Sequence, residues 1–170
     1  GQRLTAIANH LIAHFASHPK ELGNYRLVIV PCANPDGAIA GKNAQRSGKN
    51  AFGRCTAAHI DINRDFGPFK GKETRALRDF ILRSKPNVYI NAHGWLNETL
   101  GTKKLCQIVN RTLHLNKMKD GVYAANEGYA IGWVHKKLHI PCCLLEYKAP
   151  NALHTKDNVR MIREIIKAYA

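Results

Sequence analysis

Asn63 and Arg64 form a pair of side chains that can hold a carboxylate, within the run 60–66 (Ile-Asp-Ile-Asn-Arg-Asp-Phe). Arginine offers parallel N–H donors that match the two oxygens of a carboxylate, and asparagine adds a neutral donor. Beside an active site, such a pair makes a free chain terminus the first substrate to consider. The alternative interpretation is structural, an ion pair between Asp61 and Arg64 within a loop.

Glu146 is a second residue suited to chemistry, because it directly follows four apolar residues at 142–145 (Cys-Cys-Leu-Leu). A carboxylate at the end of such a strand is partly desolvated, which raises its pKa toward the range useful for proton transfer. The alternative is a glutamate that reaches solvent at the end of the strand.

His93 closes another strand-like run and is followed by Gly94. An imidazole at this point suits a metal ligand, since the glycine keeps the space beside it open. The alternative is a histidine bonded to a neighbouring backbone carbonyl.

Helical and extended patterns alternate along the chain. Apolar residues spaced three and four apart, together with capping residues, predict helices, while short apolar runs predict strands. The predicted helices are 4–15, 74–82, 102–113, 130–138 and 158–169, the predicted strands are 27–30, 88–92 and 142–145, and 42–54 is predicted to be a loop. This order predicts a single α/β domain over 1–170, with a largely parallel mixed sheet covered by helices on both faces.

The predicted sheet explains how the reactive residues would meet. In open α/β sheets, ligands bind outside the carboxyl ends of the strands. The segment 34–37 (Asn-Pro-Asp-Gly) follows one predicted strand, His93 closes a second and Glu146 closes a third. We therefore expect one site at this edge of the sheet.

Composition restricts the functional classes. The 26 Lys and Arg against 12 Asp and Glu give a net charge of +14. The basic residues are scattered, which favours a solvated surface over a nucleic-acid site, and such charge also attracts anionic cell-wall polymers or acidic peptides. Five cysteines without regular spacing are not a disulfide framework and favour a reducing, cytoplasmic compartment. No apolar run approaches the ~20 residues of a membrane span.

Three segments in order resemble the zinc carboxypeptidases, the family of carboxypeptidase A and its cytosolic and bacterial relatives. They are 34–37 (Asn-Pro-Asp-Gly), 61–64 (Asp-Ile-Asn-Arg) and 73–77 (Glu-Thr-Arg-Ala-Leu), with His93 and Glu146 at matching places. The resemblance extends over nearly the whole chain. It implies a carboxypeptidase-like fold, a Zn²⁺ cofactor, and hydrolysis of the C-terminal bond of peptides with a free terminal carboxylate.

The resemblance also implies catalytic roles. His93 corresponds to the last zinc ligand, and Glu146 to the general base that deprotonates zinc-bound water. Arg54, nine residues before Asn63, corresponds to the arginine that polarises the scissile carbonyl and stabilises the oxyanion. Arg46 is the rival for that role, because some members have a longer loop here.

Substrate binding is assigned in the same way. Asn63 and Arg64 correspond to the clamp for the terminal carboxylate. Tyr123 stands where the family has a mobile tyrosine that caps the substrate, with Tyr129 as a rival. Asp65 stands where most members carry asparagine, a change that would alter the field near the clamp.

The zinc ligand set is incomplete in this chain. The family holds zinc with a His-x-x-Glu pair and a later histidine, and the pair should precede the first helix. We expect that the chain is truncated at its N-terminus and that this pair is missing, so that the chain as given would be inactive as a peptidase without the missing zinc ligands. The His-x-x-Glu at 18–21 is rejected, because it lies after a helix and before a strand, at the opposite edge of the predicted sheet.

Two other functions stay open. One is a peptidoglycan stem-peptide hydrolase of the same family, and the other is a degenerate member that binds C-terminal tails without catalysis. The sequence leaves undecided the residue preference, the stereochemistry or linkage of the substrate, and the oligomeric state.

Overall fold

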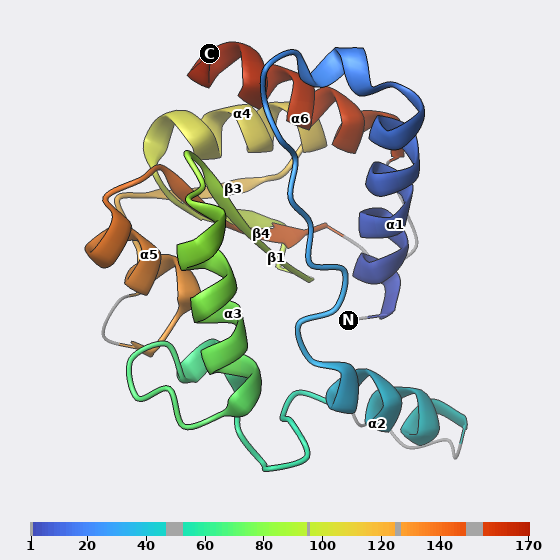
Figure 1. The fold of residues 1–170 in the computed structure, drawn as a ribbon, viewed down its shortest axis with the longest axis vertical. Helices are drawn as coiled ribbons and strands as arrows, with labels where there is room; N and C mark the ends of the chain where they lie inside the picture. Colours follow the sequence, from blue (N-terminus) through green and yellow to red (C-terminus); the bar gives the residue numbers. More distant parts are fainter. Residues whose placement is uncertain (1, 47–52, 95, 125–126, 149–154) are drawn as a thin grey trace. The chain divides into compact units, whose positions relative to one another are not determined.

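The computed structural model describes residues 2–46, 53–94, 96–124, 127–148 and 155–170 (Figure 1). The chain divides into two compact units. Unit 1 comprises Cys32–Tyr89 and Tyr123–Ile140, and unit 2 comprises residues 2–31, Ile90–Val122 and Pro141–Ala170. The chain therefore passes between the units several times.

Unit 2 contains a four-stranded sheet in the order β1-β4-β2-β3. Its strands are β1 (Tyr89–Gly94), which begins at the unit boundary, β2 (Glu98–Gly101), β3 (Lys117–Asp120) and β4 (Cys142–Tyr147). Strand β2 runs parallel to β3 and antiparallel to β4. The predicted mixed sheet of an α/β protein is confirmed.

The helices of unit 2 are α1 (Gln2–Ser17), α4 (Lys103–Leu113) and α6 (Thr155–Tyr169), with a 3₁₀ turn, η1 (Pro19–Leu22). Helix α4 lies against β2, β3 and β4, while α6 packs on α4 and α1. The apolar face of α4, including Leu105 and Val109, is fully buried, as are Cys142 and Leu145 of β4. This packing forms the core of unit 2. No helix in the described ranges is long and apolar enough to cross a membrane.

The last helix begins before its predicted start at residue 158. Helix α6 begins earlier, at Thr155, and Asn158 is fully buried inside it. The Tyr147 hydroxyl donates a hydrogen bond to Asn158 Oδ1. Because this bond satisfies a buried amide oxygen, Asn158 joins β4 to α6 instead of starting the helix.

Unit 1 contains α2 (Pro35–Arg46), the 3₁₀ turn η2 (Ile62–Arg64), α3 (Lys72–Ser84) and α5 (Ala130–Leu138). Helix α2 was not predicted. It occupies the first part of the predicted loop 42–54, of which 47–52 lie outside the described residues. Asn34 starts this helix, because its Oδ1 accepts a hydrogen bond from Gly37 N at 2.9 Å, and Pro35 suits the first helical position.

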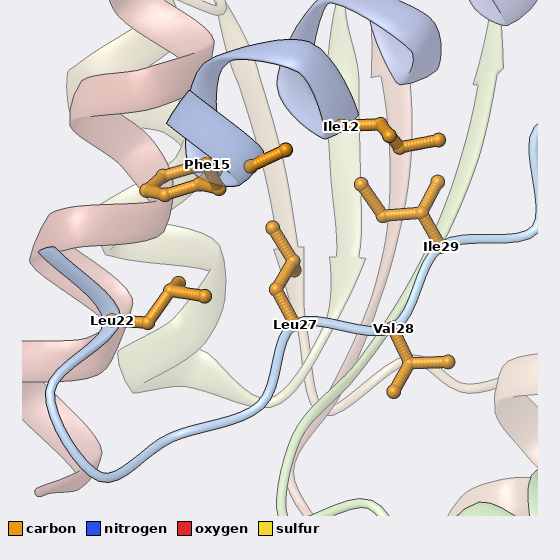
Figure 2. A pocket seen from close by; sticks show the side chains of 7 residues that line it. Ile12, Phe15, Leu22, Leu27, Val28 and Ile29 are labelled. Atoms are coloured by element: carbon orange, nitrogen blue, oxygen red, sulfur yellow. The ribbon is translucent and has the colours of Figure 1, made fainter. Parts of the chain in front are cut away.

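The prediction of a strand at residues 27–30 is wrong. The segment forms no secondary structure, and no strand pairs with it in the described part of the chain. Figure 2 shows Leu27 and Ile29 pointing toward α1, where they line an apolar groove with Ile12 and Phe15. Val28 also lines this groove and is 42% exposed. The segment has the apolar character of a strand but lacks the hydrogen-bonded neighbour that a buried strand needs.

Candidate active site

Asp61 organises the predicted clamp in unit 1. Its Oδ2 accepts a hydrogen bond from Arg54 Nε at 2.6 Å, and its Oδ1 accepts one from Asn63 N at 3.0 Å. The hydrogen bond with Asp61 is the first cause that raises the pKa of the Arg54 guanidinium. The carboxylate thus ties Arg54 to the η2 turn that carries Asn63 and Arg64.

The Asn-Pro-Asp-Gly segment fixes the backbone of Arg54. Asn34 Nδ2 donates to the Arg54 carbonyl oxygen at 3.1 Å. Gly37 packs directly against Gly53, so that a Cβ added at Gly37 would lie 2.1 Å from the Gly53 oxygen. A side chain at position 37 would therefore displace the backbone of Gly53, which directly precedes Arg54. The rival Arg46 ends α2, and its side chain is outside what the structure describes.

Arg64 is exposed and its guanidinium is held on two sides. Nη1 donates to the Asn63 carbonyl oxygen at 2.8 Å, and Cζ lies 4.2 Å from the centre of the Tyr129 ring. Tyr123 is engaged elsewhere, because its ring stacks on His135 with centroids 3.6 Å apart and planes at 6°. Of the two candidate tyrosines, Tyr129 contacts the arginine of the predicted clamp.

Asp65 faces the start of α3. It is 4% exposed and accepts hydrogen bonds from Lys70 N at 2.9 Å and Gly71 N at 2.8 Å. Burial raises the pKa of the Asp65 carboxyl, but the Gly71 and Lys70 donors outweigh burial and lower it overall. The acidic residue that departs from the family pattern is thus bound by backbone amides ahead of a helix.

His93 is the penultimate residue of β1 in unit 2. Its Nε2 donates a hydrogen bond to the side-chain oxygen of Asn91, two residues earlier in the strand. This partner is a side-chain amide, whereas the alternative considered from the sequence was a backbone carbonyl. One imidazole nitrogen is therefore oriented by the same strand that carries it.

Glu146 is the penultimate residue of β4, the strand next to β1. Burial is the main cause that raises the pKa of its carboxyl, and the negative charge of Glu98 adds to it, while a backbone N–H donor at Leu96 opposes it. Glu98 is the direct cross-strand neighbour and pairs with Lys119 at 2.9 Å. The predicted rise in the pKa of Glu146 is confirmed. Its Oε2 is buried and accepts no hydrogen bond from the described residues.

The described residues do not fit a complete zinc site. Zinc in peptidases takes about three protein ligands, and no group of three or more His, Cys, Asp or Glu in the described ranges could hold a metal ion. Glu21 of the rejected pair at 18–21 is already bound, because Arg163 donates to both of its oxygens and His14 contacts it at 3.0 Å. These contacts, led by that of Arg163, lower the pKa of Glu21 to about 2.

The structure therefore gathers the predicted residues in two groups. Arg54, Asn63 and Arg64 share one hydrogen-bonded cluster in unit 1, whereas His93 and Glu146 lie on neighbouring strands of unit 2. Sequence reasoning assigned no positioning role to Asp61, although it opens the Asp-x-Asn-Arg segment. The alternative interpretation paired Asp61 with Arg64, whereas in the structure Asp61 pairs with Arg54.

Comparison with known proteins gives a family match. A family model described as zinc carboxypeptidase matches residues 2–100. Bacteriocin BCN5 of Clostridium perfringens is 29% identical over 191 residues, which cover 99% of this chain and 20% of that protein. The chain thus spans about a fifth of the length of this curated relative.

Solved structures share the fold at low sequence identity. A murein-tripeptide amidase, MpaA from Escherichia coli O157, has a TM-score of 0.59 at 19% identity, over 81% of this chain and 66% of that one. A metallo-carboxypeptidase from Burkholderia cenocepacia has a TM-score of 0.55 at 14% identity, over 84% of this chain and 45% of that one.

Proposed function

We propose that this chain, which belongs to the zinc carboxypeptidase family of hydrolytic metallopeptidases, binds peptides by their free C-terminal carboxylate and hydrolyses the terminal peptide bond. The observation that carries the proposal is the cluster in which Asp61 ties Arg54 to the Asn63–Arg64 turn. Two guanidinium groups held in one unit suit a substrate with an anionic end and a carbonyl nearby.

Each arginine has a separate task in this proposal. Arg64 binds the terminal carboxylate, with Asn63 as a neutral donor beside it. The Nε of Arg54 is committed to Asp61, so its terminal N–H groups are the donors for the scissile carbonyl oxygen as negative charge develops there. Asp61 supports both tasks, because it orients Arg54 and the turn that carries Asn63 and Arg64.

Glu146 is the proton acceptor in the reaction. Its raised pKa and unpartnered Oε2 suit a carboxylate that takes a proton from the attacking water and returns it to the leaving amine. The new bond joins the water oxygen to the carbonyl carbon, and the C–N bond breaks. His93 is the residue that the family pattern assigns to zinc; no step is assigned to the metal, because the described residues do not form a complete zinc site.

A peptidoglycan stem peptide is the second candidate substrate. The net charge of +14 favours an anionic polymer, and the amidase of similar fold is named for a murein tripeptide. Stem peptides also end in a free carboxylate, so the same clamp would serve them. A binder of C-terminal tails without hydrolysis is the third outcome to be tested.

Hydrolysis measured with excess zinc in the assay buffer tests the proposal. An N-acetyl dipeptide, its C-terminal amide and a murein tripeptide are compared as substrates for the unchanged chain and for Arg64→Ala and Glu146→Gln. We expect Arg64→Ala to raise KM for the free acid and not for the amide. Glu146→Gln should lower kcat by about 100- to 10,000-fold, the usual range for a general base.

The matched control is Arg83→Ala, an exposed arginine of α3 outside the cluster, which should leave KM unchanged. Equal KM values for acid and amide in the unchanged chain would overturn the carboxylate assignment. If the chain binds the free acid more tightly than the amide but hydrolyses neither, the proposed hydrolase is overturned and the chain is a binder of C-terminal tails.

A further inference from the structure

The aromatic ring of Tyr129 lies against the face of the Arg64 guanidinium, with 4.2 Å between Cζ and the ring centre. The two residues are far apart in sequence but belong to the same compact unit. Tyr129 is half-buried, whereas Arg64 is exposed. The more rigidly surrounded partner is therefore the tyrosine.

Gly128 fixes the position of this ring. Its φ is +74°, and a Cβ added to it would lie 2.3 Å from the Arg64 carbonyl oxygen. The Gly128 carbonyl accepts a hydrogen bond from Phe66 N at 3.1 Å. Only glycine allows this direct approach of two backbones, so the loop before Tyr129 docks on the turn that carries Arg64.

Helix α5 anchors Tyr129 from the other side. Tyr129 is the N-cap residue of α5, and its carbonyl accepts a hydrogen bond from Trp133 N at 3.2 Å. Trp133 packs against Phe66 and Phe69, with ring centroids 5.9 and 5.7 Å apart. The tyrosine is thus held between a packed helix and the Asn63–Arg64 turn.

A ring on the face of a guanidinium leaves the N–H groups at its edge for ligands. Cation–π attraction holds the guanidinium plane, while a carboxylate binds within that plane through two parallel hydrogen bonds. Nη1 of Arg64 already donates to the Asn63 carbonyl. These two contacts restrict an exposed side chain that would otherwise sample many rotamers and lose that freedom on binding.

We propose that Tyr129 is the positioning residue that holds the Arg64 guanidinium in the plane required by a substrate's terminal carboxylate. This inference rests on the proposed function. It gives Tyr129 a role different from that of a mobile tyrosine that closes over the substrate. The aromatic ring, and not the phenolic hydroxyl, performs the positioning.

The test is the binding preference for a free acid over its amide. Calorimetry measures the dissociation constants of N-acetyl-Ala-Phe and of N-acetyl-Ala-Phe-amide. The proteins compared are the unchanged chain, Tyr129→Leu, Tyr129→Phe, Arg64→Ala and the double variant Tyr129→Leu/Arg64→Ala. Loss of the ring should reduce the acid-over-amide preference by about 2- to 30-fold, the range of a cation–π contact. Tyr129→Phe keeps the ring and should keep the preference.

Two further readouts separate positioning from general stability. The double variant should lose no more preference than Arg64→Ala alone, because the tyrosine acts through the arginine. Tyr25→Leu, which removes an exposed tyrosine of unit 2, is the matched control and should leave the acid-over-amide preference unchanged. In hydrolysis, Tyr129→Leu should raise KM for the acid while kcat stays within about twofold.

The outcomes distinguish the two proposals. If the unchanged chain binds acid and amide equally, the carboxylate function fails, and the role of Tyr129 fails with it. If the unchanged chain prefers the acid and Tyr129→Leu keeps that preference with an unchanged melting temperature, only the positioning role of Tyr129 is overturned.

Discussion

Glu146 illustrates, at the scale of a residue, how a fold raises the pKa of a carboxyl group. The strand before it is fully buried, and the residue opposite it on β2 is another carboxylate, Glu98. Burial and the like charge act in the same direction, and both raise the pKa of Glu146. Lys119 is paired with Glu98 and not with Glu146, so the unpartnered oxygen belongs to the group proposed to react.

Glu146→Gln should stabilise the chain at alkaline pH. Because the pKa of Glu146 is raised in the folded state, ionisation disfavours folding, and the unfolding free energy falls as pH rises above the ordinary carboxyl value of 4.5. Glutamine does not ionise, so the variant avoids this decrease. We expect its unfolding free energy to exceed that of the unchanged chain by about 1 kcal/mol or less at pH 8, with no difference near pH 4. Urea unfolding at both pH values measures the difference.

The matched control is Glu127→Gln, an exposed carboxylate of unit 1. If Glu146→Gln changes the unfolding free energy by the same amount at pH 4 and at pH 8, the raised pKa of Glu146 is contradicted.

At the scale of the element, helices were easier to predict than strands. Amphipathic periodicity correctly indicated α1, α3, α4, α5 and α6 near their observed bounds. Strand β3 was missed because its four residues, Lys-Met-Lys-Asp, are all exposed at the edge of the sheet, where charge is common. Strand β2 is too short, and its Glu98 and Gly101 too unlike a typical strand, for pattern alone to identify it.

Two substitutions should separate a true strand from the extended segment 27–30. Leu145 of β4 is fully buried, so Leu145→Ala should cost about 2–5 kcal/mol of unfolding free energy. Val28 is 42% exposed, so Val28→Thr should change it by no more than about 0.5 kcal/mol. Urea unfolding measures both. A cost at Val28 as large as that at Leu145 would show that the segment is covered in solution.

At the scale of the whole molecule, the predicted site residues divide between two compact units. The predicted carboxylate clamp lies in unit 1, and the predicted base and metal ligand lie in unit 2. The family match extends over residues 2–100 and so includes the clamp and His93, while Glu146 lies beyond it. The family membership therefore rests on a segment that does not include the predicted base.

The amount of zinc bound by the purified chain tests whether its zinc ligand set is incomplete. We expect the purified 170-residue chain, after exposure to zinc and dialysis, to retain far less than one zinc ion per chain, because the described residues form no group of three ligands. His93→Ala should retain the same small amount, as should the control His139→Ala. Elemental analysis measures the metal. One zinc per chain, lost only in His93→Ala, would contradict this expectation and reopen the rejection of His18 and Glu21.

The sequence by itself determined the family and the α/β class, and it supplied the residues proposed to bind a carboxylate or move a proton, because these depend on residue type and on order along the chain. Only the tertiary structure decided their partners. It paired Asp61 with Arg54 instead of Arg64, directed Asp65 to the backbone amides before α3, and placed Tyr129 against Arg64. It also showed that no strand among the described residues pairs with residues 27–30. Hydrogen bonds and ring contacts between distant segments depend on how the backbone docks, as at Gly128, and local patterns carry no record of that docking.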